Sequence, residues 1–234
     1  IHLTKVDSEY PDNKLTGATF EVYKDSNANG KLDDGDELLG TLTEKEIGEY
    51  GMNDLFYGRY FVKETKAPEG FVLDTGVYEV MIDTNGKTYE VENKAGVGFI
   101  NDAMRGNLKI VKTSSDGKVK GFAFRITGAN GYDIILETND KGEIFIDGLR
   151  IGDYTISEVN NSASSMYVIP ADKKATVKLG STTIVEMHNV LRDTPKTGDT
   201  TNLPLLYALA GLSAVGIAVC GVIGFKKKKK EDRN

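Results

Sequence analysis

Three polar residue types recur, twice each, at positions where a strand pattern calls for an apolar side chain. In IHLTKVD at 1–7 and NLKIVKT at 107–113, alternation places a lysine on the apolar face. The same alternation places a glutamate on the face of Tyr-x-Val or Tyr-x-Ile, and an asparagine after two apolar residues near the end of each copy. The six residues are Lys5, Glu64, Asn101, Lys112, Glu158 and Asn189. Six such positions in two copies indicate a site rather than chance.

Lysine, glutamate and asparagine on inward faces are expected to compensate one another, because burying an unpaired charge costs several kcal/mol. Burial makes a lysine lose its proton more easily and a glutamic acid keep it longer. The neutral amine can then attack the asparagine carboxamide while the protonated glutamate hydrogen-bonds the carbonyl oxygen and shuttles a proton, releasing ammonia. The product is a Lys–Asn isopeptide bond. An unreacted hydrogen-bonded triad, or strand-end residues that reach solvent, are the alternatives.

A second asparagine competes for the acceptor role in the first copy. Asn93 shares strand parity with Tyr89 and Val91. Asn101 is the preferred acceptor, because it lies just before the second copy and matches the apolar-x-apolar-x-Asn pattern of Asn189.

An acidic loop at 25–36 has the spacing of a calcium-binding loop. Oxygen side chains occupy positions 1, 3, 5, 9 and 12, a glycine stands at position 6, and a carbonyl is available at position 7. The ligands would be Asp25, Asn27, Asn29, Lys31 (through its carbonyl), Asp33 and Asp36. The last ligand is not a glutamate and the preceding segment reads as a strand, so a solvated turn is the alternative. Calcium is the one cofactor that the sequence suggests, and none is required.

An internal repeat organises most of the chain. GEYGMNDLFYGRYFVKE at 48–64 and GEIFIDGLRIGDYTISE at 142–158 share six of 17 residues without gaps. Strand alternation with frequent turn signals predicts an all-β fold, in which each copy is a sandwich of two antiparallel sheets. We expect one sandwich at 1–102 and a second at 103–192, with a short helix or turn near 43–47.

These features resemble the Cna B-type or SpaA-type domains of Gram-positive surface proteins and pilins. The resemblance covers residues 1–191, and its specific part is the Gly-any-Tyr-x-x-x-Glu segments together with KETKAPEGF at 63–71. It implies prealbumin-like, immunoglobulin-like sandwiches. It also implies isopeptide bonds from Lys5 to Asn101 and from Lys112 to Asn189, with Glu64 and Glu158 as the catalytic carboxyl groups.

The C-terminal end predicts a membrane span. Residues 203–225 are 23 consecutive uncharged residues, enough for a helix that crosses a bilayer core of about 30 Å. Five lysines at 226–230 open the basic tail at 226–234. Clustered lysines stay on the cytoplasmic side, so everything before the span is expected outside the cell.

Before this transmembrane helix stands a pentapeptide at 194–198 that resembles the Gram-positive cell-wall sorting signal. Its residues are Thr194, Pro195, Lys196, Thr197 and Gly198. The resemblance implies that a sortase cuts after Thr197 and joins it to the peptidoglycan cross-bridge, so contact with the membrane is transient. Thr194 stands where the family has leucine, which leaves the sortase class open. A plain single-pass anchor is the alternative for residues 193–234.

Composition and charge exclude several classes of function. One cysteine and two histidines leave little for disulfides, metal clusters or histidine-based catalysis, so we expect no enzyme acting on external substrates. Residues 1–102 carry 10 basic and 21 acidic side chains, a balance that repels nucleic acid.

The sequence therefore predicts the stalk and wall anchor of an exported Gram-positive surface protein. Because the chain starts at Ile1 without a signal peptide, we expect it to be the C-terminal part of a longer precursor. The N-terminal part would carry any head that binds host extracellular matrix or another surface ligand. A sortase-polymerised pilin and a ligand-binding adhesin module are the alternatives.

Overall fold

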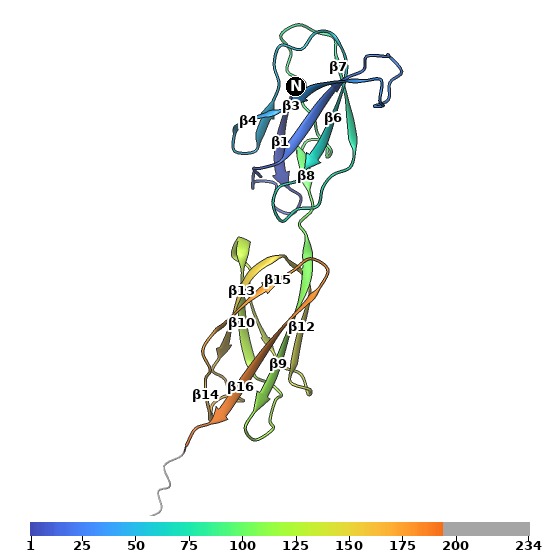
Figure 1. Cartoon of the computed structure of the whole chain (residues 1–234). Coiled ribbons are helices and arrows are strands. Elements are labelled where there is room, and N and C mark those ends of the chain that lie inside the picture. The colour runs from blue at the N-terminus through green and yellow to red at the C-terminus, as the bar shows by residue number, and fades with distance from the viewer. Residues whose placement is uncertain (194–234) are drawn as a thin grey trace, which may run out of the picture. The chain divides into compact units, whose positions relative to one another are not determined.

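The computed structural model describes residues 1–193, and the predicted sorting motif, membrane span and basic tail lie outside them. Strands β1–β8 form the first sandwich (Figure 1). They are β1 (His2–Asp7), β2 (Thr19–Lys24), β3 (Glu37–Thr41), β4 (Thr43–Glu46), β5 (Glu49–Gly51), β6 (Gly58–Lys66), β7 (Val77–Ile82) and β8 (Phe99–Asn101). One sheet has the order β4-β5-β1-β8 and the other β3-β2-β6-β7.

The second sandwich is built from the remaining strands and a short 3-10 helix, η1. Its elements are β9 (Arg105–Ser114), β10 (Ala123–Thr127), η1 (Ala129–Gly131), β11 (Asp133–Glu137), β12 (Glu143–Arg150), β13 (Gly152–Val159), β14 (Tyr167–Val168), β15 (Lys173–Val177) and β16 (Thr182–Leu191). The sheets have the orders β12-β9-β16-β14 and β11-β10-β13-β15. The prediction of two tandem all-β sandwiches is confirmed.

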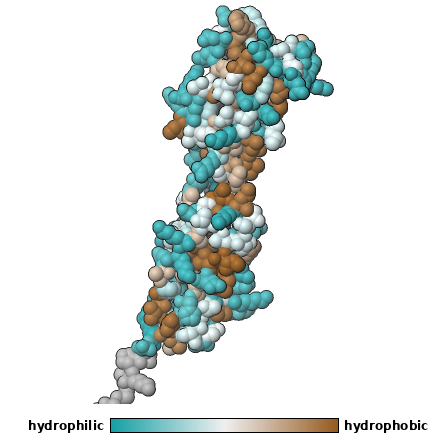
Figure 2. Space-filling view, viewed as in Figure 1, coloured by the Kyte–Doolittle hydropathy of each residue, from teal (hydrophilic) through white to brown (hydrophobic). Residues whose placement is uncertain are grey.

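Alternating strand residues fill each core, as the sequence pattern predicts. In the first sandwich Leu3, Phe20, Val62 and Phe99 are fully buried, and Phe20 packs edge-on against Phe99. In the second, the buried side chains include Leu108, Ile110, Phe124, Ile126, Ile156 and Met187. Apolar residues also remain at the surface, where Figure 2 shows them among hydrophilic ones.

The two sandwiches share a central strand plan and differ at the edges of one sheet, where β4 lies beside β5 and β14 lies beside β16. In each, the first strand pairs in parallel with the last, and the middle strand of the opposite sheet carries the repeated glutamate. In the second sandwich the last strand, β16, has ten residues and lies between β9 and β14. In the first sandwich the last strand, β8, has three residues and lies at the sheet edge.

Residues 43–46 form strand β4 rather than the expected short helix or turn, because they pair antiparallel with β5. Within residues 1–193, no helix is long and apolar enough to span a membrane.

Candidate functional site

The parallel strand pairs bring each predicted lysine beside its predicted asparagine. In the β1–β8 pair, Lys5 is opposite Phe99, so Asn101 is the next residue of β8 on the same face. In the β9–β16 pair, Lys112 is opposite Met187, and Asn189 follows at the same spacing. All four side chains are buried. The register therefore repeats the Lys–Asn relation in both sandwiches.

The two glutamates reach the same positions from the opposite sheet. Glu64 on β6 pairs with Phe20, and Glu158 on β13 pairs with Phe124. Asn101 Nδ2 donates to Glu64 Oε2 at 2.8 Å. Asn189 Nδ2 donates to Glu158 Oε1 at 2.5 Å. The structure thus brings each glutamate to the asparagine that the sequence assigns to it.

The lysine ammonium groups lie among main-chain carbonyls and aromatic rings. Lys5 Nζ donates to the Phe99 carbonyl at 2.9 Å and lies 5.4 Å from the centre of the Phe99 ring. Lys112 Nζ donates to the Thr113 carbonyl at 2.5 Å and lies 4.3 Å from the centre of the Phe122 ring. These contacts replace only part of the hydration that an ammonium group has in water.

Burial shifts the lysines and glutamates of both sites toward their neutral forms. Desolvation lowers the pKa of Lys5 to about 8, against the pull of the Glu64, Asp74 and Asp7 carboxylates. Desolvation also lowers the pKa of Lys112 and raises the pKa of both Glu64 and Glu158. A neutral amine beside a protonated carboxyl group is the form that an attack on an amide requires.

Each site also holds two buried oxygens without a hydrogen-bond partner. In the first sandwich they are Glu64 Oε1 and Asn101 Oδ1. In the second they are Glu158 Oε2 and Asn189 Oδ1. Unpaired buried polar atoms are costly, so packing alone does not account for these four oxygens.

The orientation of the asparagine amides differs in one detail from the sequence expectation. The expected contact was between the protonated glutamate and the asparagine carbonyl oxygen. In both sandwiches the amide nitrogen, which is the group that would leave, faces the glutamate instead. In the first sandwich Asn101 Nδ2 also donates to the Val72 carbonyl at 2.6 Å. Each glutamate therefore accepts a hydrogen bond from the amide nitrogen rather than donating one to the amide oxygen.

Repeated glycines support the backbone of both lysines. Gly48 and Gly142 have positive φ values of 71° and 76°, which favour glycine. Their carbonyls accept the N–H of Lys5 and of Lys112, each at 2.7 Å. A Cβ at Gly48 would meet the Lys5 carbonyl oxygen at 2.9 Å, and one at Gly142 would meet the Lys112 oxygen at 2.7 Å. The repeat conserves glycine here because the lysine strand passes too close for a side chain.

A second polar network, which the sequence analysis did not predict, adjoins the first site. Asp74 donates its N–H to Glu64 Oε2 at 2.8 Å. Its carboxylate accepts from Tyr78 Oη at 2.8 Å and from Asn93 Nδ2 at 2.7 Å. The Asn93 bond is one of several that hold the pKa of Asp74 low, whereas burial raises the pKa of Tyr78 to about 12. A pocket of about 370 Å³ lined by Asp74, Asn93 and Asn101 opens beside this network.

The acidic loop is closed by its own hydrogen bonds. Asp25 accepts the N–H groups of Asn29 and Gly30, both at 3.1 Å, and the Arg59 guanidinium at 3.3 Å. Asp33 and Asp36 accept further donors of the loop. Within residues 1–193, no three or more His, Cys, Asp or Glu side chains are grouped as a metal site. Asparagine and main-chain oxygens would have to complete a calcium site, so calcium binding stays a prediction.

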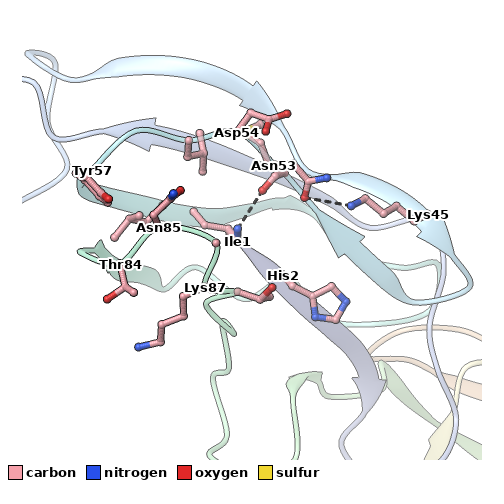
Figure 3. Close-up of a pocket in the computed structure, with 14 residues that line it drawn as sticks. Ile1, His2, Lys45, Asn53, Asp54, Tyr57, Thr84, Asn85 and Lys87 are labelled. Atoms are coloured by element: carbon pink, nitrogen blue, oxygen red, sulfur yellow. Dashed lines mark hydrogen bonds between the residues drawn. The ribbon is translucent and has the colours of Figure 1, made fainter.

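A separate pocket of about 360 Å³ lies beside Ile1 at the start of β1 (Figure 3). Lys45 and Asn53 point toward each other at its rim and are joined by a 3.3 Å hydrogen bond. Thr84, Asn85 and Lys87 line the opposite side. The pocket contains none of the six residues singled out by strand parity, so the candidate chemistry lies elsewhere.

The fold and the repeated Lys–Glu–Asn sites define a chain of two tandem prealbumin-like sandwiches. A model of the SpaA family, described as a prealbumin-like fold domain, matches residues 1–95 and 106–190. The chain therefore belongs to the SpaA prealbumin-like family.

The chain is similar to several proteins of Gram-positive bacteria. The chain is 26% identical over 194 residues to the trypsin-resistant surface T6 protein of Streptococcus pyogenes, covering 70% of this chain and 34% of that protein. Its fold is similar to the TIE protein of Bacillus anthracis, with 25% identity, a TM-score of 0.59, and coverage of 80% of this chain and 33% of that one. A minor pilin of Streptococcus agalactiae matches at 19% identity and a TM-score of 0.39, covering 84% and 97%. The chain spans about a third of the curated relative that it matches.

Proposed function

We propose that the chain is a structural part of a Gram-positive surface protein whose two domains lock themselves with Lys–Asn isopeptide bonds. One observation carries this proposal. A buried lysine, glutamate and asparagine meet in both sandwiches at the same strand register. In each, the asparagine amide nitrogen donates a hydrogen bond to the glutamate, and the asparagine amide oxygen has no hydrogen-bond partner. A site built only for stability would not leave four buried oxygens without partners.

The reaction balances without an added reagent. Neutral Lys5 Nζ attacks Cγ of Asn101, forming a C–N bond, and the bond from Cγ to Nδ2 breaks. Glu64 takes the proton from the attacking nitrogen and gives one to the departing nitrogen, so it ends as it began and ammonia leaves. Lys112, Glu158 and Asn189 perform the same step in the second domain.

The bond suits a domain that carries mechanical tension. It ties the first strand of each domain to the last, so tension applied at the two ends passes through a covalent link and the sandwich need not extend. An amide, unlike a disulfide, is not reduced. The similarity to a trypsin-resistant surface protein supports a surface location and resistance to trypsin. We assign the chain to a stalk, with a pilin subunit and an adhesin module as the competing roles.

The anchoring proposal rests on the sequence alone. Residues 194–198 would serve a sortase as its recognition motif, with Thr197 joined to the peptidoglycan cross-bridge and the span at 203–225 removed. Mass spectrometry of protein released from the wall by muramidase is expected to find Thr197 as the last residue. Mature protein that retains residues 203–234 would favour the plain membrane anchor instead.

Peptide mapping tests the cross-links directly. The full chain, produced in a host without sortase, is digested and searched for branched peptides joining Lys5 to Asn101 and Lys112 to Asn189. Glu64→Gln and Glu158→Gln, which keep side-chain size, are each expected to remove one branched peptide and leave the other. If the unaltered chain yields only linear peptides from both domains, the proposal is contradicted.

A further inference from the structure

The last strand of the first domain is interrupted just before the acceptor. Its first part bridges β1 at Glu90, opposite His2, and its second part begins at Phe99, opposite Lys5. From His2 to Lys5 the chain advances three positions, whereas from Glu90 to Phe99 it advances nine. The partner segment therefore holds six extra residues. Main-chain bonds of 3.2 and 3.3 Å between Lys94 and Gly98 close this loop. In the second domain, β16 runs from Thr182 to Leu191 as one strand.

The interruption leaves Asn101 on a weakly supported strand. β8 has three residues, and β1 is its one neighbour in the sheet. So short an edge strand has few ladder hydrogen bonds to fix the direction of its side chains. Asn189 has no such problem, because β16 has strands on both sides. Something other than the sheet must hold Asn101 against Lys5 and Glu64.

Outside the sheet, Val72 binds Asn101 Nδ2 through its carbonyl and the Asp102 carbonyl through its N–H. The residue before Asn101 is held by the Asn93 side chain. Its Oδ1 accepts the Ile100 N–H at 2.6 Å, and its Nδ2 donates to the Ile100 carbonyl at 2.8 Å. These are the two bonds that a neighbouring antiparallel strand would make to Ile100. Asn93 therefore fixes the residue immediately before Asn101.

Asp74 in turn holds Asn93 and connects it to the glutamate. Its carboxylate accepts the second hydrogen of Asn93 Nδ2 at 2.7 Å and is itself fixed by the Tyr78 hydroxyl and the Gly76 N–H. Its own N–H binds Glu64 Oε2. One set of contacts thus positions both the carboxyl group and the strand that carries the acceptor.

We propose that Asn93 is a positioning residue for cross-linking in the first domain, oriented by Asp74, and that it closes the interrupted strand so that Asn101 faces Lys5 and Glu64. This inference rests on the proposed isopeptide reaction. It also answers the alternative that Asn93 is itself the acceptor, because both atoms of its amide are engaged by Ile100 and Asp74. The second domain, with its continuous last strand, does without such a residue and provides an internal control.

The test measures the rate of bond formation in each domain of the same full chain. Chain recovered unfolded from inclusion bodies is diluted out of denaturant into detergent-containing buffer, quenched at intervals and digested, and the two branched peptides are quantified. Asn93→Ala is expected to slow the first domain at least tenfold, to leave the second unchanged, and to keep Asn101 as the linked residue. An unchanged first-domain rate, or wild-type product linked at Asn93, would overturn the proposal.

A pH profile separates positioning from a change in the reacting groups. The charged groups around Lys5 are the Glu64, Asp74 and Asp7 carboxylates. Asn93→Ala removes none of them, so the maximal rate should fall while the pH values of half-maximal rate stay the same. Asp74→Asn removes a charge and should move those values. A shifted profile in Asn93→Ala would contradict positioning.

A residue swap covers the case in which Asn93→Ala fails to fold. Asn93→Asp places a carboxylate against Asp74 and should slow the first domain, whereas the double variant Asn93→Asp with Asp74→Asn restores a donor and an acceptor and should recover part of the rate. If the double variant recovers none of the rate, Asp74 does not orient Asn93. If neither domain of the unaltered chain forms a bond, the proposed function fails and this inference with it; a loss confined to the first domain of Asn93 variants leaves the proposed function standing.

Discussion

At the scale of single residues, the proposed reaction depends on a lysine and a glutamate whose pKa values burial shifts in opposite directions. Desolvation pushes a proton off the lysine and onto the glutamate, so their neutral forms become accessible near neutral pH. Hydration would favour the charged pair, which cannot attack an amide. The same pair on a solvent-exposed strand would form at most a weak salt bridge. Burial is thus what would let the lysine act as a nucleophile and the glutamate as a proton carrier in the proposed reaction.

The pH dependence of bond formation follows from this pair. Below the raised pKa of Glu64, both Glu64 and Lys5 are protonated, so Lys5 is charged and cannot attack. Above the pKa of Lys5, about 8, both groups are deprotonated, so no proton is available for the ammonia that leaves. The rate in the first domain should therefore be bell-shaped and fall as the pH rises above about 8. Measured from branched-peptide yield against time, a rate that keeps rising up to the ordinary lysine value of 10.5 would contradict the role of Glu64.

The six residues of the two candidate sites could be singled out from the sequence because each breaks strand alternation in the same way in both copies. Asp74 and Tyr78 were not. Asp74 lies in a loop, where no periodicity marks an inward side chain, and its contact with Asn93 joins segments 19 residues apart. Strand alternation places Asn93 on an inward face, but it does not show that the strand is interrupted. The hydrogen bonds from Asn93 to Ile100 depend on that interruption.

At the scale of elements, strand register does most of the positioning. Parallel pairing of the first and last strands sets lysine and asparagine two positions apart on one face, and the opposite sheet adds the glutamate. The sandwich and its core follow from alternation and turn signals. The strand at 43–46 was missed because it is short and its four residues, TEKE, are polar, so its place in the sheet comes from pairing with β5.

The glycine beneath the lysine strand gives a prediction at this scale. Gly48→Ala should destabilise the first domain by about 2 kcal/mol or more, through strain at positive φ and a Cβ pressed against the Lys5 carbonyl. Gly86→Ala is the matched control, with a φ of 74° and nothing within 4 Å of the added Cβ. Denaturant unfolding of both in a Glu64→Gln background measures the difference. Equal losses would mean that Gly48 is required for its φ alone.

The acidic loop gives a second prediction for an element. If calcium binds, it should raise the thermal midpoint of the first domain by a margin that grows with free calcium. Asp33→Asn suits this test because Asp33 is exposed, whereas Asp25 is buried against Arg59 and its loss would loosen the loop without any metal. The variant should lose the calcium response. Identical unfolding curves in calcium and in chelator would leave the solvated turn as the sole reading.

At the scale of the whole molecule, the two proposed bonds would close each sandwich covalently from its first strand to its last. Lys5 and Asn101 are 96 positions apart, and Lys112 and Asn189 are 77 apart. By analogy with a disulfide, closing loops of this length would remove roughly 4 to 5 kcal/mol of unfolded-state entropy from each domain. With these bonds in place, resistance to extension would come from two amides rather than from strand pairing, as the proposed stalk role requires.

The intact mass of the full chain tests this account most directly, because each bond releases one ammonia molecule. The unaltered chain, made in a host without sortase, should weigh two ammonia equivalents less than its sequence. Glu64→Gln and Glu158→Gln should each recover one equivalent, and the double variant both, after correction for the substituted residues. A wild-type mass equal to that of the sequence would contradict the cross-links and leave two ordinary β-sandwiches with buried, unreacted triads.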